Sequence, residues 1–89
     1  MSRLEELNRA VTAAIMEAER LELGGQDATE AYQKVTGIEI KLARELTLDT
    51  QEGRLARIGA VRAALKAGSH ALALALLDQQ YLEELGRAV

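Results

Sequence analysis

Residues 69–85 read SHALALALLDQQYLEEL, and this stretch decides what kind of fold the chain can adopt. Seven consecutive residues, Ala71 to Leu77, carry no polar side chain, so a helix formed here is apolar on every side. A surface helix of a small protein needs one apolar stripe, and a helix that is apolar all round is buried all round. The stretch therefore predicts more apolar surface than one small chain can cover.

The composition of the chain favours a single all-α domain over residues 1–89. Alanine, leucine, glutamate and arginine dominate and proline is absent, and these residues lose little side-chain freedom in a helix. The absence of cysteine excludes disulfides and thiolate metal sites, and one histidine excludes an imidazole-rich metal cluster. Because so small a core is marginal, we expect regular helix packing, association with a second copy, or both.

Capping patterns divide the chain into four helices. A short polar residue precedes a glutamate by three positions at three places: Ser2–Glu5, Asp27–Glu30 and Asp49–Glu52. Gly68 can end a helix in the left-handed conformation and Ser69 can cap the next one. These signals predict helices over residues 3–23, 28–46, 50–67 and 70–85. Similar lengths and short turns predict an up-down bundle of four antiparallel helices, which dimerisation could complete.

Apolar residues at helical spacing assign an inward face to each helix. The stripes are Leu4, Leu7, Val11, Ala14, Ala18 and Leu21 in the first helix; Ala28, Tyr32, Val35, Glu39, Leu42 and Leu46 in the second; Leu55, Ile58, Arg62 and Leu65 in the third; and Leu74, Leu77, Tyr81 and Leu85 in the fourth. Residues 37–42, GIEIKL, also alternate with the period of a strand. We prefer a helix over residues 37–43, because a lone strand would find no partner strand in this chain.

The fourth helix carries a second apolar face opposite its inward stripe. Leu72 and Leu76 project from this face, and Ala73 and Ala75 lie between them. Contiguous exposed apolar residues usually mark an interaction site, and a symmetric homodimer is the commonest way to cover one. We therefore predict a homodimer interface at these four residues, with another helical protein as the alternative partner.

Two charged residues fall inside the stripes. Glu39 lies at the centre of the second stripe and Arg62 at the centre of the third, at similar distances from the turn that joins the two helices. Their positions predict a partly buried ion pair, since a guanidinium can hold a carboxylate with two hydrogen bonds. The alternative is that both side chains extend past the edges of their stripes into water.

Basic residues gather in the third helix, although the net charge of −3 gives the whole chain no attraction to nucleic acid. Arg54, Arg57 and Lys66 could contact phosphates, because residues 54–66 contain no acidic residue. The following helix has no basic residue over residues 70–82 and so lacks the base-reading face of a helix-turn-helix.

The sequence contains no catalytic or cofactor motif. His70 is in the first turn of its helix without a nucleophile to activate, because Ser2 and Ser69 are explained as caps. The longest apolar run is far shorter than the ~20 residues that span a bilayer, and the N-terminus lacks the apolar segment of a secretory signal.

We therefore expect a cytoplasmic, non-enzymatic interaction module without metal or cofactor, such as an adaptor, a small subunit or a chaperone-like protein. It would associate with itself through the fourth helix. The alternative is a regulatory nucleic-acid-associated protein that uses the basic third helix.

Overall fold

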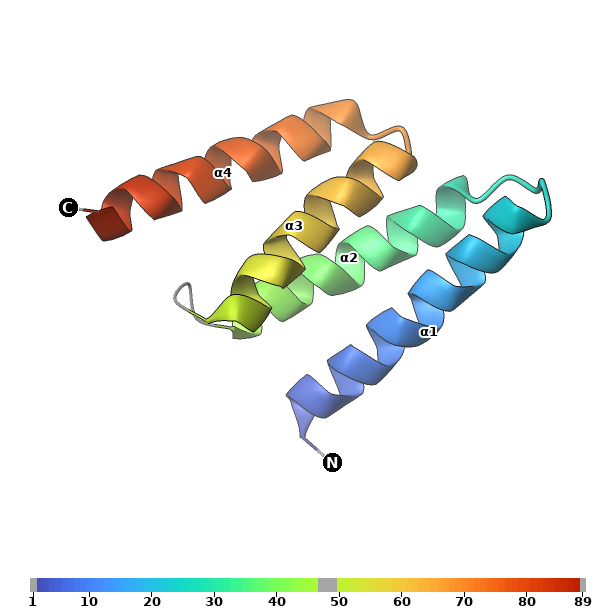
Figure 1. Cartoon of the computed structure of the whole chain (residues 1–89), viewed down its shortest axis with the longest axis horizontal. Helices are drawn as coiled ribbons and strands as arrows, with labels where there is room; N and C mark the ends of the chain where they lie inside the picture. The colour runs from blue at the N-terminus through green and yellow to red at the C-terminus, as the bar shows by residue number, and fades with distance from the viewer. Residues whose placement is uncertain (1, 47–49, 89) are drawn as a thin grey trace.

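The computed structural model describes residues 2–46 and 50–88, with side chains described as far as residue 79. Four helices follow one another: α1 (Arg3–Leu23), α2 (Thr29–Glu45), α3 (Gln51–Lys66) and α4 (His70–Ala88). The described ranges contain no strand, and residues 37–43 are helical (Figure 1). The predicted small all-α helical bundle is confirmed.

In α1 and α3 the residue directly before the helix caps it with its side chain. Ser2 accepts a hydrogen bond from the backbone N–H of Glu5 at 3.1 Å, as the capping pattern predicts. Thr50 accepts one from the N–H of Gly53 at 3.0 Å, so α3 is capped by a threonine hydroxyl. Asp49, which was the predicted cap of this helix, lies outside the described residues.

The start of α2 differs from the prediction by one residue. Ala28 is the cap residue and makes no side-chain hydrogen bond. Asp27, one position earlier, accepts hydrogen bonds from the N–H of Thr29 at 3.0 Å and from its hydroxyl at 2.6 Å. These two bonds lower the pKa of Asp27, with the hydroxyl contributing most. Asp27 thus caps the helix from the preceding turn.

Glycines with positive φ end two helices. Gly68 has φ 76°, and the N–H of Ser69 reaches back to the carbonyl of Ala64 at 2.8 Å, which makes a Schellman motif. The predicted left-handed glycine is therefore confirmed at the end of α3. Gly25, with φ 73°, ends α1 in the same way.

The helices form an open array in which each one lies against its neighbours in the chain. The backbones of α1 and α2 approach each other, as do those of α2 and α3 and of α3 and α4, whereas no other pair does so within the described ranges. Figure 1 shows α1 and α2 side by side, α3 returning along α2, and α4 turning back from the end of α3. The Cα atoms span 46 × 34 × 15 Å, so the array is flat.

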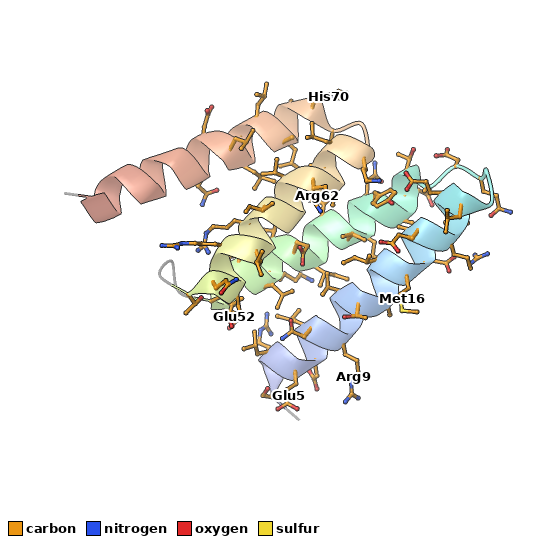
Figure 2. All side chains as sticks on the ribbon, in the orientation of Figure 1. Glu5, Arg9, Met16, Glu52, Arg62 and His70 are labelled. Atoms are coloured by element: carbon orange, nitrogen blue, oxygen red, sulfur yellow. The ribbon has the colours of Figure 1, made fainter. Side chains whose placement is uncertain are left out.

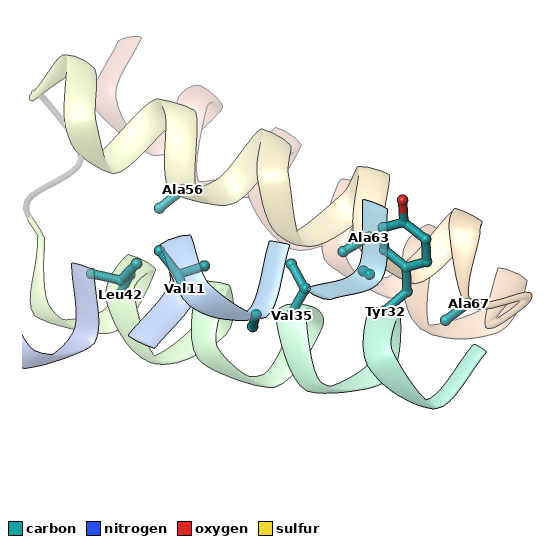
Figure 3. Packing of buried hydrophobic residues seen from close by; sticks show 9 residues of the cluster. Val11, Tyr32, Val35, Leu42, Ala56, Ala63 and Ala67 are labelled. Carbon is teal, nitrogen blue, oxygen red and sulfur yellow. The ribbon is translucent and has the colours of Figure 1, made fainter. Parts of the chain in front are cut away.

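The main core joins the first three helices (Figure 3). It contains Val11, Ala14, Ala18, Tyr32, Val35, Leu42, Ala56, Ala63 and Ala67. The inward faces predicted for α1 and α2 are confirmed, since every buried residue of α1 lies in its stripe. A second, smaller cluster of Val61, Ala64 and Ala73 joins α3 to α4, with Leu76 packed against it.

The inward face predicted for α3 is wrong. Leu55 is 58% exposed, Ile58 45% and Leu65 49%. The buried face consists of small residues: Gly53, Ala56, Ala60, Ala63, Ala64 and Ala67, with Val61 at its edge. Because α3 packs between α2 and α4, short side chains let both neighbours come close, and the large side chains remain outside.

The inward face predicted for α4 is also wrong over the described side chains. Leu74 is 62% exposed and Leu77 is 46% exposed. Ala73, which is only 1% exposed, makes the contact with α3 in their place, and Leu76 is half-buried beside it. The remaining stripe residues, Tyr81 and Leu85, lie outside the described side chains.

Two glycines allow a matched stability test. Gly37 lies inside α2 with open space around it, whereas Gly68 needs its positive φ. We expect Gly37→Ala to raise the free energy of unfolding by about 0.5–1 kcal/mol through helix propensity. We expect Gly68→Ala to lower it by about 1–2 kcal/mol, because an alanine is strained in the left-handed region. Urea unfolding followed by circular dichroism measures both, and equal effects of the same sign would contradict this reading of the backbone.

Candidate functional site

A groove of about 610 Å³ runs over α2 between α1 and α3. It exists because both helices pack on α2 while their backbones stay apart. Its wall on α1 consists of Ile15, Glu19, Glu22 and Leu23; its floor on α2 of Tyr32, Val35 and Glu39; and its wall on α3 of Leu55, Ile58, Gly59, Arg62, Ala63 and Lys66. The groove is therefore mainly apolar, with acidic residues on one wall and basic residues on the other.

Glu39 places a carboxylate in the floor of this groove. The residue is only 8% exposed, and it makes no hydrogen bond or ion pair with any described residue. The carboxylate lies against Gly59 of α3, where an added Cβ would overlap it. Gly59 thus makes room for Glu39 between α2 and α3. Sequence reasoning missed this role, and its only signal was a helix-weakening glycine in the middle of a helix.

The Glu39 carboxylate remains open to the groove. Over the described side chains, no completely buried oxygen or nitrogen lacks a hydrogen-bond partner, so the unpaired carboxylate of Glu39 is not completely enclosed. Burial raises the pKa of Glu39 above its ordinary value, because a carboxylate loses hydration in an apolar contact. A cation entering the groove would therefore stabilise its charged form.

Arg62 lies on the wall above Glu39 but does not pair with it. Its side chain is exposed on α3 (Figure 2), and it forms no hydrogen bond or ion pair with a described residue. The ion pair predicted between the two residues is therefore not formed within the chain. The physical reason is that Glu39 lies along Gly59 in the helix contact, whereas Arg62 extends from the solvent face of α3.

An ion pair bridges one end of the groove. Lys66 Nζ lies 3.2 Å from Glu22 Oε1, and the Tyr32 hydroxyl donates to the same oxygen at 3.1 Å. The ammonium also lies 5.2 Å from the centre of the Tyr32 ring. The hydrogen bond from Lys66 is the main cause of a lowered pKa of Glu22, and burial is the main cause of a raised pKa of Tyr32. These side chains connect α1 to α3 where the backbones do not meet.

Two of the three residues predicted to contact phosphates bind other groups of the chain. Arg57 donates to the carbonyls of Gly53 at 2.8 Å and Ala43 at 3.2 Å, so it satisfies the last turn of α2. Lys66 is held by Glu22. Arg54 is exposed on α3. The described residues thus offer no cluster of uncommitted cations on this helix that would favour phosphate binding.

Three of the four predicted interface residues of α4 lie around a second groove. Leu72, Ala75 and Leu76 line it together with residues of α2 and α3, and its volume is about 490 Å³. Leu72 is 40% exposed and Ala75 is exposed. Ala73 is buried against α3 within the same chain, so it cannot belong to an intermolecular surface as predicted. Ala73 is the described residue of α4 that packs most closely on Val61 and Ala64 of α3.

Other candidate chemistry is sparse. His70 is exposed in the first turn of α4. Over residues 2–46 and 50–88, no three histidine or carboxylate side chains come together as metal ligands would, and no helix has the length and apolar content needed to cross a bilayer. Comparison of the chain with protein families, curated proteins and solved structures found no match. The two grooves and the exposed apolar side chains are the candidate features on which a proposal can be built.

Glu39→Gln tests the cost of the buried carboxylate. A raised pKa means that the folded chain binds this proton more tightly than the unfolded chain, so stability falls as pH rises above the ordinary value of 4.5. We expect Glu39→Gln to be more stable than the wild type at neutral pH and equally stable well below pH 4.5. Urea unfolding of dilute protein at both pH values measures the difference. A variant less stable than the wild type at neutral pH would show that Glu39 has a stabilising partner.

Proposed function

We propose that this protein is a non-enzymatic helical interaction module whose first partner is a second copy of itself. The observation that carries the proposal is the reversed packing of α3 and α4. Small side chains fill the inside of α3, and Ala73 makes the buried contact of α4 over its described side chains, whereas Leu55, Ile58 and Leu65 of α3 and Leu74 and Leu77 of α4 face solvent.

The exposed apolar side chains belong to adjacent helices. Leu55, Ile58 and Leu65 project from α3, and Leu74 and Leu77 from α4, all of them at least 45% exposed. Fully burying one such side chain contributes about 1.5–3 kcal/mol, so covering several can offset the entropy lost on association. Soluble monomers seldom expose large contiguous apolar patches, and such surfaces usually bind another protein.

The open arrangement supports the same proposal. Within the described chain α4 packs on α3 alone, and over its described side chains Leu74 and Leu77 are 62% and 46% exposed. A helix apolar on every side is stable in water only when neighbours cover it. Self-association supplies such neighbours without a further protein, and a two-fold axis would cover both copies at once.

Charged substitutions on α3 test the proposal. We expect the wild type to sediment as a dimer at micromolar to millimolar concentration, and Ile58→Glu/Leu65→Glu to sediment as a monomer, because an interface would bury the introduced carboxylates. Sedimentation velocity measures both, with circular dichroism as a check on folding.

Met16→Glu is the matched control, since Met16 is 65% exposed on α1 and lines neither groove. It should remain dimeric. A wild type that is monomeric throughout this range would overturn the proposal of self-association.

A further inference from the structure

The groove between α1 and α3 is bounded by three helices. α2 forms its floor and the two flanking helices form its walls. In a closed four-helix bundle the fourth helix would occupy this space, but here α4 packs on the other side of α3. An occupant would therefore contact three helices at once, through Ile15, Val35 and Leu55 among others.

The floor of the groove specifies more than an apolar occupant. Glu39 is more than nine-tenths buried, faces the groove and has no partner among the described residues. Burying an unpaired carboxylate still further under an apolar helix would be unfavourable. The occupant must therefore bring a cation to Glu39, and an arginine suits this position because its guanidinium can bind a carboxylate through two hydrogen bonds.

The exposed face of α3 has this pattern. Leu55, Ile58, Arg62 and Leu65 follow one another at spacings of three, four and three residues, so they form one face of the helix. The three apolar side chains are 45–58% exposed, and Arg62 is without a partner among the described residues. The same chain thus carries a groove with an unpaired buried carboxylate and a helix face with an unpaired arginine between apolar residues.

We propose that α3 of a second copy docks in the groove between α1 and α3, so that Arg62 of each copy pairs with Glu39 of the other. The inference rests on the proposed self-association and specifies its geometry. Because α3 is both the wall of one groove and the ridge that enters the other, a two-fold axis beside α3 satisfies both sites at once.

The charges of the walls agree with this arrangement. The wall on α1 carries Glu19 and Glu22 and the wall on α3 carries Arg62 and Lys66, and of these four residues Glu22 and Lys66 pair with each other within the chain. Docking α3 of the second copy against α1 brings its Arg62 near the wall that carries Glu19, whereas the Glu22–Lys66 pair stays within each chain. Opposite charges across an interface favour the correct partner and fix its register.

Mixing two charge-reversed chains distinguishes pairing between copies from pairing within one chain. We expect Glu39→Lys and Arg62→Glu each to weaken the homodimer about 30-fold or more, because each puts like charges together. An equimolar mixture should form a heterodimer with near wild-type affinity, since the unchanged arginine of one chain meets the unchanged glutamate of the other. Native mass spectrometry measures the heterodimer directly. Homodimers that stay weak without forming a heterodimer would overturn the proposal.

The control pair is Glu30→Lys and Lys41→Glu. Both residues are exposed on α2 and neither lines the groove. We expect each of these chains to form a homodimer of wild-type affinity, and their mixture to show the statistical ratio of homodimers to heterodimer. Preferential heterodimers from the control pair would mean that overall charge, and not the proposed contact, governs pairing.

A milder double-mutant cycle covers the case in which Glu39→Lys does not fold. Glu39→Gln and Arg62→Met should each raise the dimer Kd. The double variant should raise the Kd by a factor much smaller than the product of the two single factors. Independent effects on the dimer Kd would overturn the docking geometry. A wild type that dimerises but does not respond to either change would overturn only this inference, whereas a monomeric wild type would overturn the proposed function as well.

Discussion

The close approach of α3 to its two neighbours is the constraint on which the rest of the structure depends. Alanine and glycine cover the side of α3 that meets α2 and α4, and these side chains are too short to hold the helices apart. Dispersion attraction grows with the number of atoms in contact, so a close contact between small residues can replace a wider one between leucines. As a result, the leucines and the isoleucine of α3 have no place inside the chain and define its outer surface.

A second effect of this contact is the position of Glu39. Gly59 leaves a space at the contact between α2 and α3, and the carboxylate occupies it without gaining a partner among the described residues. A buried charge of this kind weakens the isolated chain, whereas in an interface it discriminates against partners that are merely apolar. The buried carboxylate of Glu39 would thus both lower the stability of the isolated chain and make its binding selective.

The sequence predicted α1 and α2 well for a definite physical reason. In both helices one face is mainly apolar and the opposite face is charged, so only one orientation buries most of the apolar surface, although Glu39 of α2 is buried with it. In α3 and α4 both faces are apolar. Because leucine is more hydrophobic than alanine, a prediction from hydrophobicity alone places the leucine face inside. In α3 the structure buries the alanine face because two neighbouring helices must fit on it, and in α4 it buries Ala73 against α3 while Leu74 and Leu77 stay exposed. This arrangement is a property of the whole array that no single helix pattern contains.

The same distinction applies to the candidate site. Glu39 and Arg62 could be singled out because each interrupts an apolar stripe. That they share a groove without pairing could not be predicted, because it depends on the orientation of α3 about its axis and on the space at Gly59.

The serial order of the helices also has a kinetic consequence. Each helix packs on the one that precedes it in the chain, so nearly all tertiary contacts join segments close in sequence. Chains with such a low contact order lose little loop entropy on the way to the native state and fold in microseconds to milliseconds. On the ribosome, each helix could dock on its predecessor as soon as it emerges. The apolar outer face of α3 would then be exposed to solvent before a second copy of the chain binds to it.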